Sequence, residues 1–243
     1  MFTTLFYNPL YNLLVIFLQV TPHADVGVSI VLLTILVKIV LYPLNKSSAV
    51  TQHKMKKVEK EIKDVKKKHN DQKDVALKTM EIYQRESIKP FASIIPIFLQ
   101  IPIFIALYMI FSKGIVNSPA HLYSFMHFPE VVSTLAFGVF DVSKKYILVG
   151  FLTGASYFLL AKIQTKKMVS SPKADDDKDS FAFQFNDMMK KQIMYVFPLL
   201  TGITAAVFPS AIGVYWITSN LIGIVQSYFI NLHLTEREEK KEK

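Results

Sequence analysis

Long apolar runs alternate with charged segments along this chain. Five runs of about 20 residues lie between positions 26 and 230. A helix rises about 1.5 Å per residue and the hydrocarbon core of a membrane is about 30 Å thick, so one run matches one crossing. The pattern predicts an all-α polytopic membrane protein with five transmembrane helices. The runs are residues 26–44, 91–111, 145–163, 192–208 and 211–230.

These runs and the polar segments between them define the expected organisation of the chain. Only Pro209 and Ser210 separate the last two runs, which indicates a tight turn between antiparallel spans. We expect an N-terminal interfacial amphipathic helix (1–23), a first transmembrane helix (24–45), a cytoplasmic helical hairpin (46–89), a second transmembrane helix (90–112), an external loop (113–144), a third transmembrane helix (145–164), a cytoplasmic loop (165–190), the fourth and fifth transmembrane helices (191–231) and a cytoplasmic tail (232–243).

The segment 5–20 near the N-terminus is apolar but short, and Pro9 leaves too few uninterrupted residues after it for a crossing. Asn8, Asn12 and Gln19 recur at spacings of four and seven, which places them on one helical face. This pattern favours a helix that lies in the membrane interface, with Tyr7 and Tyr11 at headgroup depth. A short helix buried in the protein core is the alternative.

Lysine and arginine residues are distributed unevenly over the polar segments. Thirteen of the 28 lie in residues 46–89, seven in residues 162–191 and four after residue 231. Residues 1–37 have none, and residues 113–145 have three. Because cytoplasmic loops of membrane proteins are rich in lysine and arginine, this distribution predicts an external N-terminus and a cytoplasmic C-terminus.

The segment 46–89 is too polar to enter the membrane and is rich in helix-forming residues. Opposite charges recur at helical spacing, as in Glu59 and Lys63, and apolar stripes indicate two helices that pack on each other. Its net charge is +6, from thirteen basic and seven acidic residues. Three interpretations of such a basic hairpin are open: it binds RNA, it binds anionic lipid, or its charges form only a solvated surface. The residues that we expect to recruit partners are Lys54, Lys56, Lys57 and Lys60.

Lys38 lies inside the first apolar run and marks a polar site in the bilayer. A lysine near the bilayer centre costs about 2.5–3.5 kcal/mol on insertion scales. None of the five runs contains Asp or Glu, so Lys38 has no carboxylate partner within them. This absence disfavours a proton-coupled or cation-coupled transporter and favours a receptor for a negatively charged group. The alternative is a lysine that snorkels, because Lys38 is roughly 9 Å along a helix from the cytoplasmic edge.

The composition excludes several classes of protein. The chain has no cysteine, which excludes disulfides, thiolate metal sites and cysteine nucleophiles. It has no glycine-rich phosphate loop, and its six histidines are not spaced as metal ligands within any apolar run. We therefore expect no enzyme activity, no catalytic residue, no metal and no cofactor.

The order of features resembles the YidC family of membrane protein insertases, in the short bacterial form without a large external domain. Nearly the whole chain takes part in the resemblance. The segments that carry it are Asn-Pro-Leu-Tyr-Asn at 8–12, Leu-Thr-Ile-Leu-Val-Lys-Ile-Val-Leu-Tyr-Pro-Leu at 33–44, the basic hairpin, Pro-Ile-Phe-Leu-Gln-Ile-Pro-Ile-Phe at 96–104, Phe-Pro-Ser-Ala at 208–211 and Tyr-Trp-Ile-Thr-Ser-Asn at 215–220.

The resemblance implies a five-helix core with a hydrophilic groove that is open to the cytoplasm and to lipid and closed on the outer side. The family places a basic residue, most often arginine, in this groove, and Lys38 matches its position. Lysine keeps the charge but lacks the two-pronged geometry of arginine, so point-charge attraction remains. The residues that the resemblance assigns to the groove are Lys38, Thr34, Gln100, Trp216, Ser219 and Asn220.

The function implied is the movement of short hydrophilic tails of substrate proteins across the bacterial inner membrane, followed by release of their apolar spans into lipid. The implied partners are nascent membrane-protein substrates and, beside them, the ribosome, targeting factors, the Sec translocon and anionic lipid. A small-anion transporter or channel that uses Lys38 as its binding charge is the alternative. A surface protein that binds nucleic acid or lipid through the hairpin is a third interpretation.

Overall fold

A computed structural model describes residues 1–69, 71–93, 95–113, 121–165, 188 and 191–239. Its elements, in chain order, are η1 (Thr3–Tyr7), α1 (Asn8–Val20), η2 (Pro22–Ala24), α2 (Val26–Val40), α3 (Tyr42–Lys57), α4 (Glu59–Lys68), α5 (Gln72–Arg85), η3 (Pro90–Ser93), α6 (Ile95–Lys113), β1 (Leu135–Ala136), β2 (Phe140–Asp141), α7 (Ile147–Thr165), η6 (Gln192–Val196), α9 (Phe197–Val207) and α10 (Ser210–Glu239).

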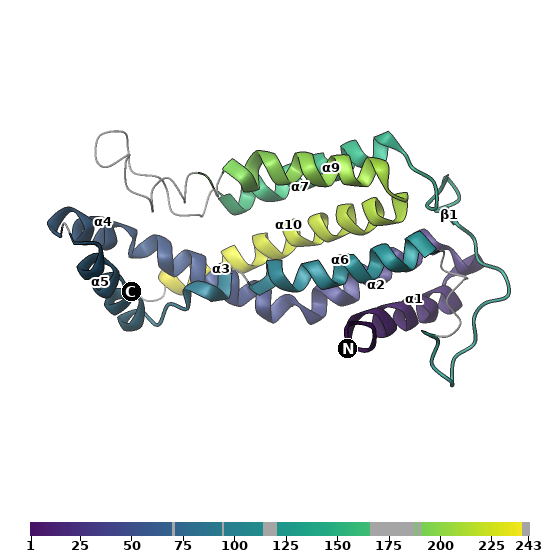
Figure 1. Cartoon of the computed structure of the whole chain (residues 1–243), viewed down its shortest axis with the longest axis horizontal. Helices are drawn as coiled ribbons and strands as arrows, with labels where there is room; N and C mark the ends of the chain where they lie inside the picture. Colours follow the sequence, from purple (N-terminus) through teal and green to yellow (C-terminus); the bar gives the residue numbers. More distant parts are fainter. Residues whose placement is uncertain (70, 94, 114–120, 166–187, 189–190, 240–243) are drawn as a thin grey trace.

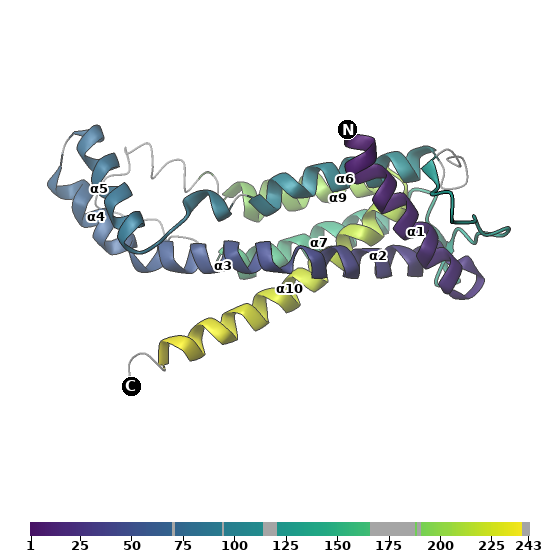
Figure 2. The ribbon, with the colours of Figure 1, turned by 90° about the horizontal axis from the view of Figure 1, so that it is seen from below.

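The helices form an elongated bundle with different structures at its two ends (Figure 1). Helix α10 lies between the pair α7 and α9 on one side and α2 and α6 on the other, and α1 crosses the bundle obliquely (Figures 1 and 2). Helices α4 and α5 extend from one end. The strands β1 and β2 and the loop around them lie at the opposite end. The chain is mostly helical where it is described.

A bend separates α2 from α3. The two helices meet at an angle of 55°, at a break beside Leu41. Pro43 lies in the first turn of α3 and has no backbone N–H to donate to the carbonyl of Ile39. The bend follows from this interruption of the helical hydrogen-bond ladder.

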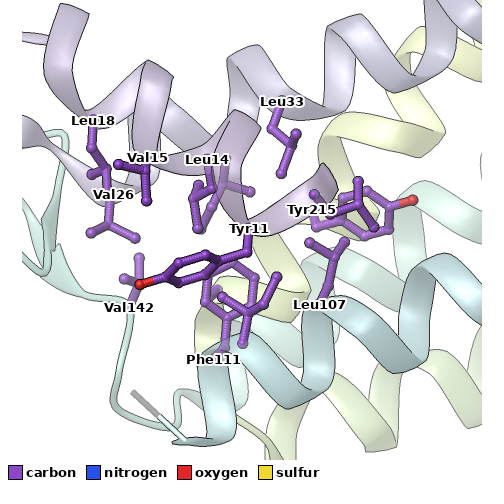
Figure 3. Packing of buried hydrophobic residues seen from close by; sticks show 14 of the residues in the cluster. Tyr11, Leu14, Val15, Leu18, Val26, Leu33, Leu107, Phe111, Val142 and Tyr215 are labelled. Carbon is purple, nitrogen blue, oxygen red and sulfur yellow. The ribbon is translucent and has the colours of Figure 1, made fainter. Parts of the chain in front are cut away.

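Helix α1 contributes a large part of the main hydrophobic core. Tyr11, Leu14 and Leu18 are buried among residues of α2, α6 and α10, such as Leu107 and Tyr215 (Figure 3). Tyr7 is buried as well, although the polar stripe predicted both tyrosines at the membrane interface. Both tyrosines therefore face the protein core on this side of α1, whereas Ile16 and Val20 of the same helix are exposed.

The polar stripe of α1 has protein partners. Asn12 is buried; its amide donates to the carbonyls of Asn8 at 2.7 Å and His121 at 2.8 Å, and its carbonyl accepts from the Tyr123 N–H at 2.8 Å. Gln19 donates to the carbonyl of His127. The stripe therefore bonds to the backbone of residues 121–127, in the loop that follows α6.

The same loop is attached to the starts of α2 and α10. Asp25 caps α2 by accepting from the Val28 N–H at 3.0 Å, and its other oxygen accepts from the Phe137 N–H at 2.8 Å. The Ala211 N–H donates to the Val142 carbonyl at 3.0 Å. Strands β1 and β2 form a small antiparallel ribbon whose turn includes Gly138 at a φ of 69°, a conformation that suits glycine. The ribbon is a small addition to the predicted all-α fold.

Helices α7 and α9 pack closely because small residues line their contact. A Cβ atom added to Gly150 would lie 2.6 Å from the Gly202 carbonyl oxygen and 2.6 Å from the Ala206 Cβ atom. A Cβ atom added to Gly154 would lie 3.0 Å from the Pro198 carbonyl oxygen. Close contact through small residues is a common way for helices to associate in membranes.

The segment predicted as a basic hairpin contains three helices, α3, α4 and α5. Val58, Ile82 and Ile88 form its buried core, with Ile62 and Val65 packed against them, so the predicted apolar stripe is confirmed. The predicted pair of Glu59 and Lys63 is present at 2.6 Å. A bidentate pair between Arg85 and Glu61 joins α5 to α4, and its hydrogen bonds lower the pKa of the Glu61 carboxyl.

The described helices differ in how well they match a membrane crossing. Helix α7 is long and apolar enough to cross by itself. The bent pair α2 and α3 passes the same criterion when taken together. The apolar stretches Phe98–Ser112 and Gln192–Val207 are shorter. By length and composition, the described residues thus contain one such helix, or two when the bent pair is one span.

Candidate functional site

Lys38 lies in the last turn of α2, just before the bend. Its side chain is half-buried, and its ammonium makes no hydrogen bond or ion pair with any residue that the structure describes. The apolar runs around it contain no Asp or Glu. An ammonium that is partly removed from water and has no carboxylate partner attracts anionic groups more strongly than one in open solution.

The backbone at Lys38 is held by α10. The Gln226 side chain donates to the Lys38 carbonyl at 3.1 Å, and its own carbonyl accepts from the Asn45 amide of α3 at 3.2 Å. These partners are 188 and 181 residues from Gln226 in sequence. Gln226 therefore bridges the two sides of the bend.

Thr34 lies one helical turn before Lys38 and is fully buried. Its hydroxyl donates to the Ile30 carbonyl of the same helix at 2.6 Å. This intrahelical bond satisfies the hydroxyl donor, and the oxygen keeps the capacity to accept a further bond.

Gln100 and Trp216 lie at the contact between α6 and α10. The Gln100 amide donates to the Tyr215 hydroxyl at 2.7 Å. The Trp216 ring stacks on Phe104, with ring centroids 5.0 Å apart and planes 14° apart. The contact between α6 and α10 thus contains one polar pair, Gln100 with Tyr215, and one aromatic pair, Phe104 with Trp216, on neighbouring helical turns.

Ser219 and Asn220 are buried in α10. The Asn220 amide donates to the Ser156 hydroxyl of α7 at 3.0 Å, and this hydroxyl donates to the Thr153 carbonyl at 2.9 Å. Asn220 thus faces the α7 side of α10, whereas Trp216 contacts α6.

The lysines predicted to recruit partners follow the base of the hairpin. Lys54, Lys56 and Lys57 lie in the last turn of α3, and Lys60 lies in the first turn of α4. The Lys54 ammonium donates to the Glu86 carbonyl at 3.0 Å and so ties α3 to the end of α5. Lys56, Lys57 and Lys60 are exposed.

Helix α10 contains three of the predicted groove residues, Trp216, Ser219 and Asn220, and it bonds to two others, Gln100 and Lys38. It contacts α2, α6 and α7, and its Trp216, Asn220 and Gln226 each contact a different one of them. The sequence does not indicate that Asn45 bonds to Gln226, because an asparagine at the end of an apolar run is typical of a helix end. The sequence does give an indication for Gln226, because a glutamine inside an apolar run requires polar partners.

A helical bundle with a basic helical end, and a lysine in an acid-free apolar region that has no partner among the described residues, are features expected of an α-helical membrane protein. A family model described as 60Kd inner membrane protein matches residues 8–238. The chain belongs to this family, which includes the membrane protein insertases named YidC.

Curated relatives support the same assignment. The chain is 33% identical over 227 residues to the membrane protein insertase YidC of Fusobacterium nucleatum, with 92% of this chain and 96% of that protein covered. It is 29% identical over 210 residues to the protein of that name from Oceanobacillus iheyensis, with 84% and 74% covered. The relative from Actinobacillus pleuropneumoniae serotype 3 is 28% identical over 233 residues, which are 95% of this chain and 37% of that longer protein.

Proposed function

We propose that this chain is a membrane protein insertase that moves short hydrophilic tails of substrate proteins through a groove carrying Lys38. The observation that carries the proposal is the half-buried Lys38 ammonium, which has no partner among the described residues and no acidic residue in the surrounding apolar runs. The names of the curated relatives support the same function.

In this mechanism Lys38 attracts an acidic or polar tail part of the way into the membrane. The ammonium acts as a point charge, since lysine lacks the planar fork with which arginine grips a carboxylate. The remaining groove residues are Thr34, Gln100, Trp216, Ser219 and Asn220. Transfer of the apolar span of the substrate into lipid then favours release, because burial of about 20 apolar residues is strongly favourable. The chain needs no cofactor for these steps.

The proposed topology has five crossings, an external N-terminus and a cytoplasmic C-terminus in the bacterial inner membrane. Its support is the arrangement of charge along the bundle. The helices α4 and α5, from the segment with thirteen basic residues, lie at one end, and the loop that contains β1 and β2 lies at the other (Figure 1). This separation agrees with the excess of lysine and arginine on cytoplasmic sides.

The hairpin end is the proposed landing surface for partners. Lys56, Lys57 and Lys60 are exposed there, and basic side chains attract nucleic acid, acidic proteins and anionic lipid headgroups. The partners that fit this surface are nascent membrane-protein chains, the ribosome, targeting factors, the Sec translocon and anionic lipid. Lys54 belongs to the same cluster and also braces α5.

Complementation of a bacterium depleted of its own insertase tests the proposal. We expect growth with the unmutated chain and with Lys38→Arg, weaker growth with Lys38→Ala, and none with Lys38→Glu. Lys162→Ala is the matched control, because Lys162 is an exposed lysine in the last turn of α7. Equal growth with all Lys38 variants would refute the electrostatic mechanism, and failure of the unmutated chain would refute the insertase function.

A further inference from the structure

The bend between α2 and α3 is bridged by one side chain from a third helix. Gln226 of α10 donates to the Lys38 carbonyl of α2 at 3.1 Å and accepts from the Asn45 amide of α3 at 3.2 Å. Figure 2 shows α10 and α3 separating from each other toward the end that carries α4 and α5. The bridge therefore lies near the point where these helices diverge.

A glutamine side chain suits both arms of this bridge. Its amide has one NH₂ group to donate and one carbonyl oxygen to accept, and each is used on a different side of the bend. The Lys38 carbonyl is in the last turn of α2, where helical carbonyls lack part of their own ladder. Glutamate would lose the donor and leucine would lose both arms, so each arm has a separate chemical requirement.

The first arm holds the peptide unit of Lys38 itself. A hydrogen bond to this carbonyl restrains the backbone from which the Lys38 side chain extends. The second arm restrains α3 relative to α10, because Asn45 lies in the first turn of α3. Any change in the bend would therefore move α3 and the Lys38 backbone together.

We propose that Gln226 is a positioning residue that holds the bend between α2 and α3 against α10 and thereby sets the position of the Lys38 ammonium. Its significance for insertion depends on the proposed function of Lys38. The geometric part can be measured without any substrate.

Distances between spin labels test the geometric part. The chain has no cysteine, so pairs of labels can be introduced without removing native residues. Lys60→Cys, exposed in the first turn of α4 just beyond the end of α3, and Leu221→Cys, exposed on α10, report the distance between the far end of α3 and α10 in the full chain in lipid nanodiscs. Helix α3 has 16 residues, about 24 Å, so a change of about 10° in the bend moves its far end by about 4 Å.

We expect Gln226→Leu and Asn45→Ala to shift or broaden the label distance by about this amount. Asn45→Ala removes one arm only and keeps the test valid if Gln226→Leu does not fold. The control is Thr204→Val, which removes a hydroxyl bonded only to Leu200 within α9 and should leave the distance unchanged. An unchanged distance in both bridge variants would overturn the proposal.

The link to Lys38 is tested with reporter proteins that carry either an acidic or a neutral tail. Gln226→Leu should reduce the preference for the acidic tail, and Thr204→Val should retain it. An altered label distance with an unchanged preference would overturn the positioning role. If the unmutated chain shows no preference between tails, the proposed function of Lys38 fails, and the distance result still decides the geometric part.

Discussion

Gly150 of α7 packs against α9 with no space for a methyl group, and Gly150→Ala tests this contact. The added Cβ atom would lie 2.6 Å from the Gly202 carbonyl oxygen and 2.9 Å from the Ala206 backbone nitrogen. Both are backbone atoms, so the clash cannot be relieved by rotating a side chain. The two helices must separate, and neighbouring contacts of the α7 and α9 pair are lost with them.

The expected free-energy change combines two opposing effects. Alanine is a better helix former than glycine by about 1 kcal/mol, which favours the variant. Inserting atoms into a well-packed contact costs about 1–3 kcal/mol, and the upper value applies where only backbone can move. The net loss of stability is about 2 kcal/mol, which corresponds to a decrease of about 4–8 °C in Tm for a chain of this size.

Gly223→Ala is the matched control, because the substitution is the same and the neighbour is different. Its added Cβ atom would lie 3.2 Å from the Leu160 Cδ2 atom, the end of a flexible side chain. Thermal unfolding of both variants in the same detergent, followed by circular dichroism, should give a lower Tm for Gly150→Ala only. A Tm for Gly150→Ala equal to or above that of Gly223→Ala would refute the close packing of α7 on α9.

Two further predictions concern the ends of the bundle. Asn12→Leu removes the buried amide that bonds the loop after α6 and leaves the Tyr123 N–H without its acceptor. We expect a loss of about 1–3 kcal/mol and faster proteolysis of the loop, measured by Tm and by limited digestion; unchanged digestion would contradict the loop attachment. The hydrogen bond from Arg85 lowers the pKa of the Glu61 carboxyl below its usual value of about 4.5. The pair therefore stabilises the hairpin fully above the usual pKa, and this stabilisation is lost as the pH falls through the lowered pKa of the folded protein. Hydrogen exchange of α5 should therefore accelerate in acid in the unmutated chain and depend less on acid in Glu61→Gln, and identical pH profiles would exclude the pair as the cause.

Much of the bundle could be predicted from the sequence because it depends on local patterns. The short turn at Pro209 follows directly from the lack of residues between two apolar runs, and α10 begins at Ser210. The pair of Glu59 and Lys63 follows from its spacing of four. Such features need only neighbours along one helix or one turn.

The position of α1 could not be predicted in the same way. A polar stripe has the same spacing whether it faces water or the backbone of a distant loop. The partner of Asn12 at His121 is 109 residues away, and no local pattern indicates such a contact. The burial of Tyr7 and Tyr11 has the same origin.

In the candidate site, too, some features follow from the local sequence and others depend on contacts between distant residues. Lys38 was recognisable because a lysine in an acid-free apolar run is unusual, which is a property of composition. Its support by Gln226 and Asn45 depends on bonds across 188 and 181 residues, which the sequence alone does not reveal. The bond of Asn220 to Ser156 is a further case, at a separation of 64 residues.

The central claim is that the charge of Lys38 acts on the charge of the substrate tail. The most direct measurement is insertion into proteoliposomes of reporters that differ only in a short acidic, neutral or basic tail, with Lys38, Lys38→Ala and Lys38→Glu compared. Loss of an interaction of about 1.4 kcal/mol corresponds to a tenfold change. We predict that the unmutated chain prefers the acidic tail about tenfold, that Lys38→Ala removes this preference and that Lys38→Glu reverses it toward the basic tail. The same order of preference in all three proteins would contradict the claim.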